Sequence, residues 1–247
     1  MEGELIMALG DEFKSSGITE NTPKTVMLGA GTIHKGLKFD YVLLTTQPSD
    51  WSTGYSNYYT RTGSTGNYTY NPVSSSTSWT AETYYKKGWN FEESLICATS
   101  GGSKLSIVPE FYDVPVDGAL VKVKGLTVKV GETAKLEINP IELTGEILNM
   151  AVIANSNPSD TATGYTELTS RSVINAGDYL QNMGYVGKTI EGKPIIIIFD
   201  NALCTSGLEL EGKNKEAAVP NFVFECFADL SPEADTLPWH IYYPTAD

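Results

Sequence analysis

The chain has 247 residues, of which 41% are apolar and 19% charged, and its 17 basic and 30 acidic side chains give a net charge of −13. This length fits a single all-β domain, and the composition is neither that of a disordered chain nor that of a membrane protein. The acidic balance argues against binding of nucleic acid through its phosphates, because such binding needs clustered Lys and Arg.

The first residues, 1–20, predict an N-terminal arm. Leu5, Ile6, Leu9 and Phe13 are spaced to share one face of a short helix, which would be marginal alone and would need a partner surface. Residues 24–44 then predict a strand, a glycine break at 29–31 and a second strand, because glycines permit a bulge or a close backbone approach.

Residues 45–90 change in character and predict an insertion, a long hairpin or loop. The segment is rich in Ser, Thr, Gly and Asn, has few charges, and carries more rings than a flexible linker does. Three interpretations stay open: a loop folded over the core, a subunit contact, and a carbohydrate-binding surface. The candidate contact residues are Trp51, Tyr55, Tyr58, Tyr59, Tyr68 and Tyr70.

Residues 95–139 alternate apolar and polar side chains, which predicts strands with one buried face. A helix is predicted over 139–152, with Asn139 as its N-cap and Pro140 at its first position. Residues 194–229 return to β structure. There, a strand from Leu203 to Glu211 would place Glu209 and Glu211 together on one face, and 220–228 would close the hairpin.

These elements predict a mainly β fold over 1–247, a β-sandwich or partly open barrel of two packed sheets with one flanking α-helix. The odd number of cysteines, three without a CxxC motif, favours buried thiols over disulfides. The N-terminus lacks a signal-peptide pattern, and apolar runs such as 195–199 are too short to span a bilayer, so we expect synthesis in a cytoplasm and no membrane contact.

The sequence offers little catalytic chemistry. His34 and His240 are far apart and lack the short ligand spacing of a metal site. The glycines at 29–31 form an incomplete dinucleotide motif, since position 34 is a histidine. A paired-acid site at Glu209 and Glu211 is less favoured than a solvated strand face. We therefore expect no enzyme, no cofactor and no metal.

Several short motifs follow one another along the chain in a recognisable order. They are Leu28-Gly29-Ala30-Gly31-Thr32, Lys35-Gly36, Cys97-Ala98-Thr99-Ser100-Gly101-Gly102, Val108-Pro109-Glu110-Phe111, Val116-Asp117-Gly118, Lys124-Gly125-Leu126, Glu142-Leu143-Thr144 and Ile241-Tyr242-Tyr243-Pro244. This order resembles that of the tail tube (major tail) proteins of phages and prophages of Gram-positive bacteria. The resemblance covers residues 24–40 and 95–152 well and 165–244 less distinctly, whereas the insertion 45–90 departs from it.

The resemblance implies a structural virion protein, made in the host cytoplasm, that forms hexameric rings stacked into the tail tube. Its partners would be copies of itself, a tape-measure protein, a baseplate initiator and a tail terminator, with DNA passing through without being bound. The family has no catalytic residues to transfer. We expect the insertion rings to make subunit contacts, and Glu209 and Glu211 to face the lumen, where acid repels DNA.

A different class of function is also consistent with the residues. The chain would be a virion-surface or secreted glycan-binding (adhesin) module that stays monomeric and uses the aromatic insertion to stack on sugars.

Overall fold

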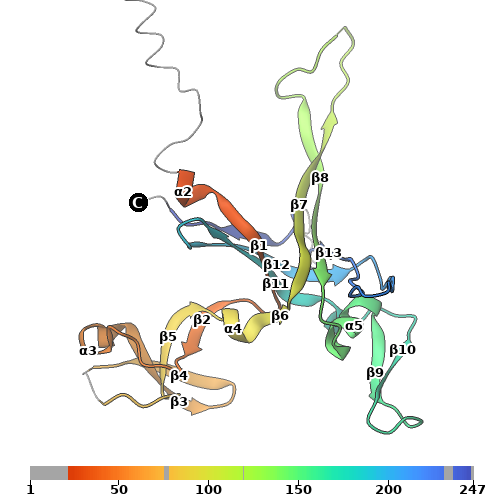
Figure 1. Cartoon of the computed structure of the whole chain (residues 1–247). Helices are drawn as coiled ribbons and strands as arrows, with labels where there is room; N and C mark the ends of the chain where they lie inside the picture. The colour runs from red at the N-terminus through yellow and green to blue at the C-terminus, as the bar shows by residue number, and fades with distance from the viewer. Residues whose placement is uncertain (1–21, 75–77, 119, 231–235, 246–247) are drawn as a thin grey trace, which may run out of the picture.

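The computed structural model describes residues 22–245 except 75–77, 119 and 231–235 (Figure 1). The N-terminal segment 1–20, predicted as a helical arm, therefore lies outside the described residues. The mainly β prediction is confirmed: antiparallel strands form sheets of eight, four and two strands, with a few short helices. Two of the short helical pieces are α2 (Thr22–Thr25) and η2 (Ala176–Asp178).

The eight-stranded sheet holds the main core. Its order is β6-β1-β11-β12-β13-β8-β7, and β14 pairs with β12 beyond the end of β13. Its strands are β1 (Met27–His34), β6 (Leu95–Cys97), β7 (Thr99–Asp113), β8 (Thr127–Pro140), β11 (Leu180–Thr189), β12 (Pro194–Cys204), β13 (Phe222–Cys226) and β14 (Trp239–Tyr242). The predicted glycine break in β1 is a register shift between Leu28 and Thr32.

This sheet curls so that the start of β7, at one edge, comes close to β1 near the other edge, while the rest of β7 stays an open edge. β6 and β7 are the first and last strands in its order, yet only Ala98 separates them in the chain. The curl encloses alternating apolar residues of most strands, including Ile33, Leu136 and Phe199. All three cysteines are free and buried, as the sequence predicts.

The flanking helix, α5 (Gly145–Val152), is shorter than the predicted 139–152. Asn139 and Pro140 instead belong to β8, where Pro140 pairs with Thr99 and is fully buried. The N-cap is Thr144, whose hydroxyl accepts a hydrogen bond from the Ile147 N–H at 3.3 Å. Burial of Pro140 in the strand therefore outweighs the local preference for a helix start.

The predicted strand from Leu203 to Glu211 is also wrong beyond its first residues. β12 ends at Cys204, and 205–221 contains no strand. Leu208 and Leu210 are 39% and 48% exposed, so no buried face stabilises strand pairing there.

The insertion 45–90 folds, together with β2 from the residues before it, into the four-stranded sheet, ordered β2-β5-β3-β4. Its elements are β2 (Phe39–Leu43), α3 (Trp51–Gly54), η1 (Tyr55–Asn57), β3 (Tyr58–Ser64), β4 (Asn67–Pro72) and β5 (Tyr84–Trp89), with α4 (Phe91–Ser94) following. The Asn90 side chain joins the two connections to the main sheet, accepting from the Lys38 N–H at 2.8 Å and donating to the Gly36 carbonyl at 3.1 Å.

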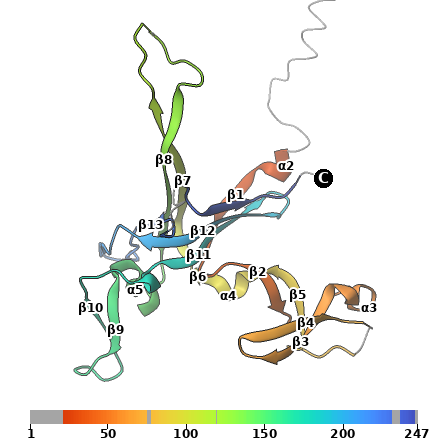
Figure 2. The ribbon, with the colours of Figure 1, turned by 180° about the vertical axis from the view of Figure 1, so that it is seen from behind.

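Three parts project from the main sheet (Figures 1 and 2). The outer half of the β7–β8 hairpin extends to one side, at the top of both views. The four-stranded sheet and the two-stranded hairpin of β9 (Ala154–Pro158) and β10 (Thr166–Ser170) extend to the opposite side. The molecule therefore has two different ends along the direction of the long hairpin.

Candidate subunit-contact surface

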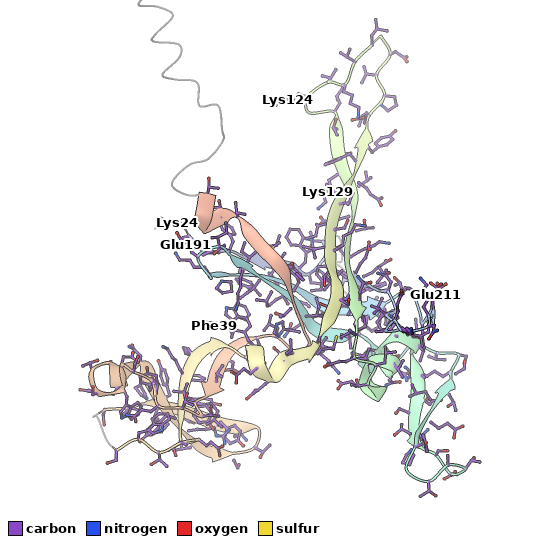
Figure 3. The ribbon with its side chains drawn as sticks, viewed as in Figure 1. Lys24, Phe39, Lys124, Lys129, Glu191 and Glu211 are labelled. Carbon is purple, nitrogen blue, oxygen red and sulfur yellow. The ribbon has the colours of Figure 1, made fainter. Side chains whose placement is uncertain are left out.

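The outer part of the β7–β8 hairpin, residues 108–133, is here called the arm (Figure 3). At the root of the hairpin Leu105 pairs with Leu136 and Ile107 with Ala134, and these side chains pack on the main core. Because side chains alternate along a strand, Val128 and Val130 continue the face that Leu136 and Ala134 begin. Glu132 lies between them on this face and accepts a hydrogen bond from Trp239 Nε1–H, so the face carries apolar residues in the core and again, past Glu132, on the arm.

A bulge between Glu110 and Phe111 shifts the register of the arm. Beyond the bulge Tyr112 lies opposite Val128, and Phe111 lies opposite Lys129, so large apolar side chains occupy both faces. Most of them are open to solvent: Val108 50%, Phe111 63%, Tyr112 50%, Val116 50%, Leu120 98%, Val121 77% and Val130 61%.

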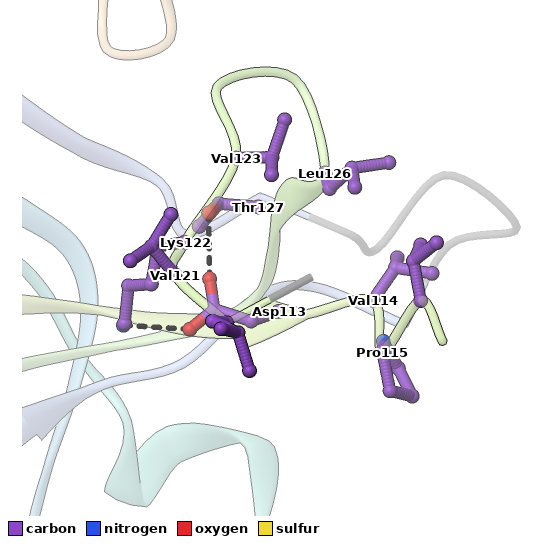
Figure 4. A pocket seen from close by; sticks show the side chains of 10 residues that line it. Asp113, Val114, Pro115, Val121, Lys122, Val123, Leu126 and Thr127 are labelled. Carbon is purple, nitrogen blue, oxygen red and sulfur yellow. Dashed lines mark hydrogen bonds and ion pairs between the residues drawn. The ribbon is translucent and has the colours of Figure 1, made fainter. Parts of the chain in front are cut away.

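Polar contacts hold the end of the arm in shape (Figure 4). Asp113 accepts a hydrogen bond from the Thr127 hydroxyl at 2.6 Å and forms an ion pair with Lys122 at 2.6 Å. The hydrogen bonds from Lys122 and Thr127 lower the pKa of the Asp113 carboxyl. A hollow of about 320 Å³ lies beside them, and it is lined mainly by apolar side chains. These are Val114, Pro115, Val116, Leu120, Val121, Val123 and Leu126.

The arm departs from what a monomeric soluble protein usually exposes. A two-stranded hairpin on its own is marginally stable in water, and contiguous exposed apolar surface marks an interaction site. β7 is also an edge strand of 15 residues, and long uncovered edges favour pairing with another chain. Both features fit a surface that is completed by a second protein molecule.

The predicted contact rings of the insertion fall on both faces of the four-stranded sheet. Trp51 and Tyr58 are 4% and 0% exposed in a small aromatic core, with Tyr55 packed at its rim. The Tyr58 hydroxyl donates a hydrogen bond to the Asp50 carboxylate. Trp51 and Tyr58 therefore stabilise the insertion itself and are not open to a neighbour in this fold.

The opposite face carries the remaining rings. Tyr70 stacks on Tyr41 with ring centroids 3.8 Å apart, and Tyr59 meets Tyr41 edge-on at 4.8 Å. Tyr68 is 40% exposed, and the Arg61 guanidinium lies 4.2 Å from its ring centroid. Of the proposed contact residues, Tyr68 presents the most surface, and a contact role for this set stays a prediction.

Glu209 and Glu211 lie in the segment between β12 and β13, not on a strand. Both are exposed, and Glu211 forms an ion pair with Lys213 at 3.5 Å. The premise that a strand places them on one face is wrong, while a lumen-facing role stays a prediction.

His34 is buried, and both of its ring nitrogens form hydrogen bonds with hydroxyl groups. The Ser94 hydroxyl donates to the Asn90 carbonyl at 2.7 Å, so it accepts from His34 Nδ1–H at 2.9 Å. Nε2 is then the acceptor for the Thr32 hydroxyl at 2.8 Å. Burial lowers the pKa of His34, so the ring is neutral at pH 7.

No set of three or more His, Cys, Asp or Glu side chains within the described residues is arranged to hold a metal ion. In the same part of the chain, every helix is too short or too polar to cross a bilayer. Compared with models of known protein families and with curated proteins, the sequence matches none.

Proposed function

We propose that the chain is a structural subunit that assembles with copies of itself into stacked hexameric rings, the tail tube through which phage DNA leaves the virion. The observation that carries this proposal is the arm, an apolar hairpin that extends away from the body and is uncovered in the single chain. In stacked rings, the arm would be buried against neighbouring subunits.

Two further features support assembly. The sheet curls with β7 as a long open edge, and strands of a neighbouring subunit would pair with this edge to continue the sheet. The curled sheet with α5 at its side supports the finer expectation for a tail-tube-like subunit, a β-sandwich or partly open barrel of two packed sheets with one flanking α-helix. The net charge of −13 favours a lumen from which DNA is repelled, since like charges act over a Debye length of about 8 Å.

The remaining partners follow from the same proposal. A tube of defined length needs a baseplate initiator at one end, a tape-measure protein inside and a terminator at the other end. The subunit itself supplies contacts and a passive channel, so the proposal includes no catalytic step.

The test is negative-stain electron microscopy of the purified chain over a range of concentrations, with mass measured by light scattering. Rings or tubes with six-fold end views are the expected result. A monomer near the chain mass of 26.8 kDa at every concentration would contradict the proposal.

A second candidate function rests on the insertion. Tyr68 presents a partly exposed ring beside Arg61, and flat rings flanked by hydrogen-bond donors also bind sugars. A glycan array probed with the chain and with its Tyr68→Ala variant distinguishes this function. Sugar binding that is lost in the variant would favour the adhesin alternative.

A further inference from the structure

The four-stranded sheet has an open groove along its edge strand β2. This groove, formed by residues 42–46 and 89–93, has a volume of about 490 Å³. Its apolar lining comes from Val42, Leu43, Leu44, Trp89 and Phe91. Glu92 and Glu93 add two exposed carboxylates, and none of the described residues that line the groove is cationic.

The backbone of β2 is open on the side away from β5. Asn90 N–H donates to the Lys38 carbonyl and Leu44 N–H to the Tyr84 carbonyl, so the even-numbered residues of β2 bond to β5. In an antiparallel ladder, the odd-numbered residues then direct their N–H and C=O groups to the free edge. The Asp40 carboxylate accepts the Tyr41 N–H at 2.8 Å, which leaves Leu43 as the best placed to bond an added segment.

The end of the arm has the opposite character. Residues 120–124 read Leu-Val-Lys-Val-Lys, an alternation of apolar and basic side chains. Leu120 and Val121 are 98% and 77% exposed. Lys122 pairs with Asp113 but keeps 80% of its side chain exposed, and Lys124 forms no ion pair with the described residues. Residues 120–124 therefore offer apolar and cationic groups, on an arm end that also carries the carboxylates of Asp113 and Asp117, whereas the groove offers apolar and anionic groups.

The two surfaces also lie at opposite ends of the molecule. Figure 3 places Lys124 at the end of the arm and Phe39, in β2, on the four-stranded sheet on the other side. A chain cannot fill its own groove with its own arm in this fold. The arm of a second copy, displaced along the direction of the arm, can reach this groove. Such a head-to-tail contact can be repeated from copy to copy without forming a closed ring, as stacking requires.

We infer that the arm end of one copy, residues 120–124, binds the groove of a second copy, with Lys122 and Lys124 beside Glu92 and Glu93. This inference rests on the proposed self-assembly and names the receiving surface. It assigns the insertion a role as the receptor for the arm.

Charge reversal tests the contact. In one variant Lys122→Glu and Lys124→Glu make both surfaces acidic, and in another Glu92→Lys and Glu93→Lys make both basic. Each variant alone should assemble at least about tenfold more weakly, because two exposed charge pairs change from attraction to repulsion. A mixture of the two variants, and a chain that carries all four changes, should regain assembly, which excludes misfolding as the cause of the loss.

Cross-linking gives an independent readout. A chain with Val123→Cys mixed with a chain with Thr45→Cys should form a disulfide dimer at high concentration, since the native cysteines are buried. Thr163→Cys, an exposed site on the other projecting hairpin, replaces Thr45→Cys in the control mixture and should form little dimer.

The outcomes separate this inference from the proposed function. If the wild-type chain assembles and both charge-reversed variants assemble equally well, the arm–groove contact is wrong while self-assembly stands. If the wild-type chain stays monomeric, the proposed function fails and the cross-link decides the contact. A cross-link no stronger than the Thr163 control overturns the inference.

Discussion

Replacing Phe111 by serine tests whether the arm serves assembly or folding. Phe111 is 63% exposed and lies opposite Lys129 on the arm, away from the main core. Its loss should change the free energy of unfolding by no more than about 0.5 kcal/mol, as is usual for exposed positions. Its effect on assembly should be much larger, because the phenyl group of Phe111 would be buried against a neighbouring subunit.

The size of this effect follows from the exposed area. A Phe side chain has roughly 200 Å² of surface, so a 63% exposed ring keeps about 125 Å² for burial in a contact. At roughly 25 cal/mol per Å² this area is worth ~3 kcal/mol for each contact, as an upper limit. The concentration needed for half-maximal assembly should therefore rise by up to about a hundredfold.

Sedimentation velocity over a concentration series measures the assembly, and urea unfolding measures the stability of the same samples. Tyr165→Ser is the matched control, because Tyr165 is 73% exposed but lies between β9 and β10, away from the arm. The reasoning is refuted if Phe111→Ser and Tyr165→Ser assemble alike, or if Phe111→Ser mainly lowers the free energy of unfolding.

Three further predictions concern stability. Burial, together with the hydrogen bond to Asp50, raises the pKa of Tyr58 from 10.0 to about 12. The neutral Tyr58 hydroxyl therefore adds to the free energy of unfolding in full below pH 10, and this contribution is lost as the pH rises through 12. Urea unfolding against pH should show this loss, and Tyr58→Phe should abolish it. Burial lowers the pKa of His34, so protonation of the ring should lower the free energy of unfolding as the pH drops below 6.5. If His34→Gln loses as much free energy of unfolding in acid as the wild type does, this prediction is contradicted. Gly31→Ala should lower the free energy of unfolding by about 1–3 kcal/mol, since φ is +69° and a Cβ would lie 2.6 Å from the Tyr185 ring; calorimetry that finds no loss would refute the clash.

Local patterns predicted the strands well where one face is buried in the chain's own core. The alternation around Leu136 and Ile138 gave β8, and the β-branched run at 195–199 gave β12. The same reasoning failed at Asn139 and Pro140, whose local preference for a helix start is overridden by the burial of Pro140 beside Thr99. It also failed at 205–211, where alternation occurs without a partner strand to bury it.

The sequence by itself determined the class of fold, the burial of the cysteines and the presence of an aromatic segment unlike the rest of the chain. Periodicity and composition carry this information because they act within a few residues. The tertiary structure decided which apolar faces are covered. Only the curled sheet shows that the face of β8 continues past the core at Val130, and only strand pairing divides the insertion rings between two faces, with Tyr58 inside and Tyr68 outside. Burial is a property of contacts between distant segments, and residue spacing alone does not encode it.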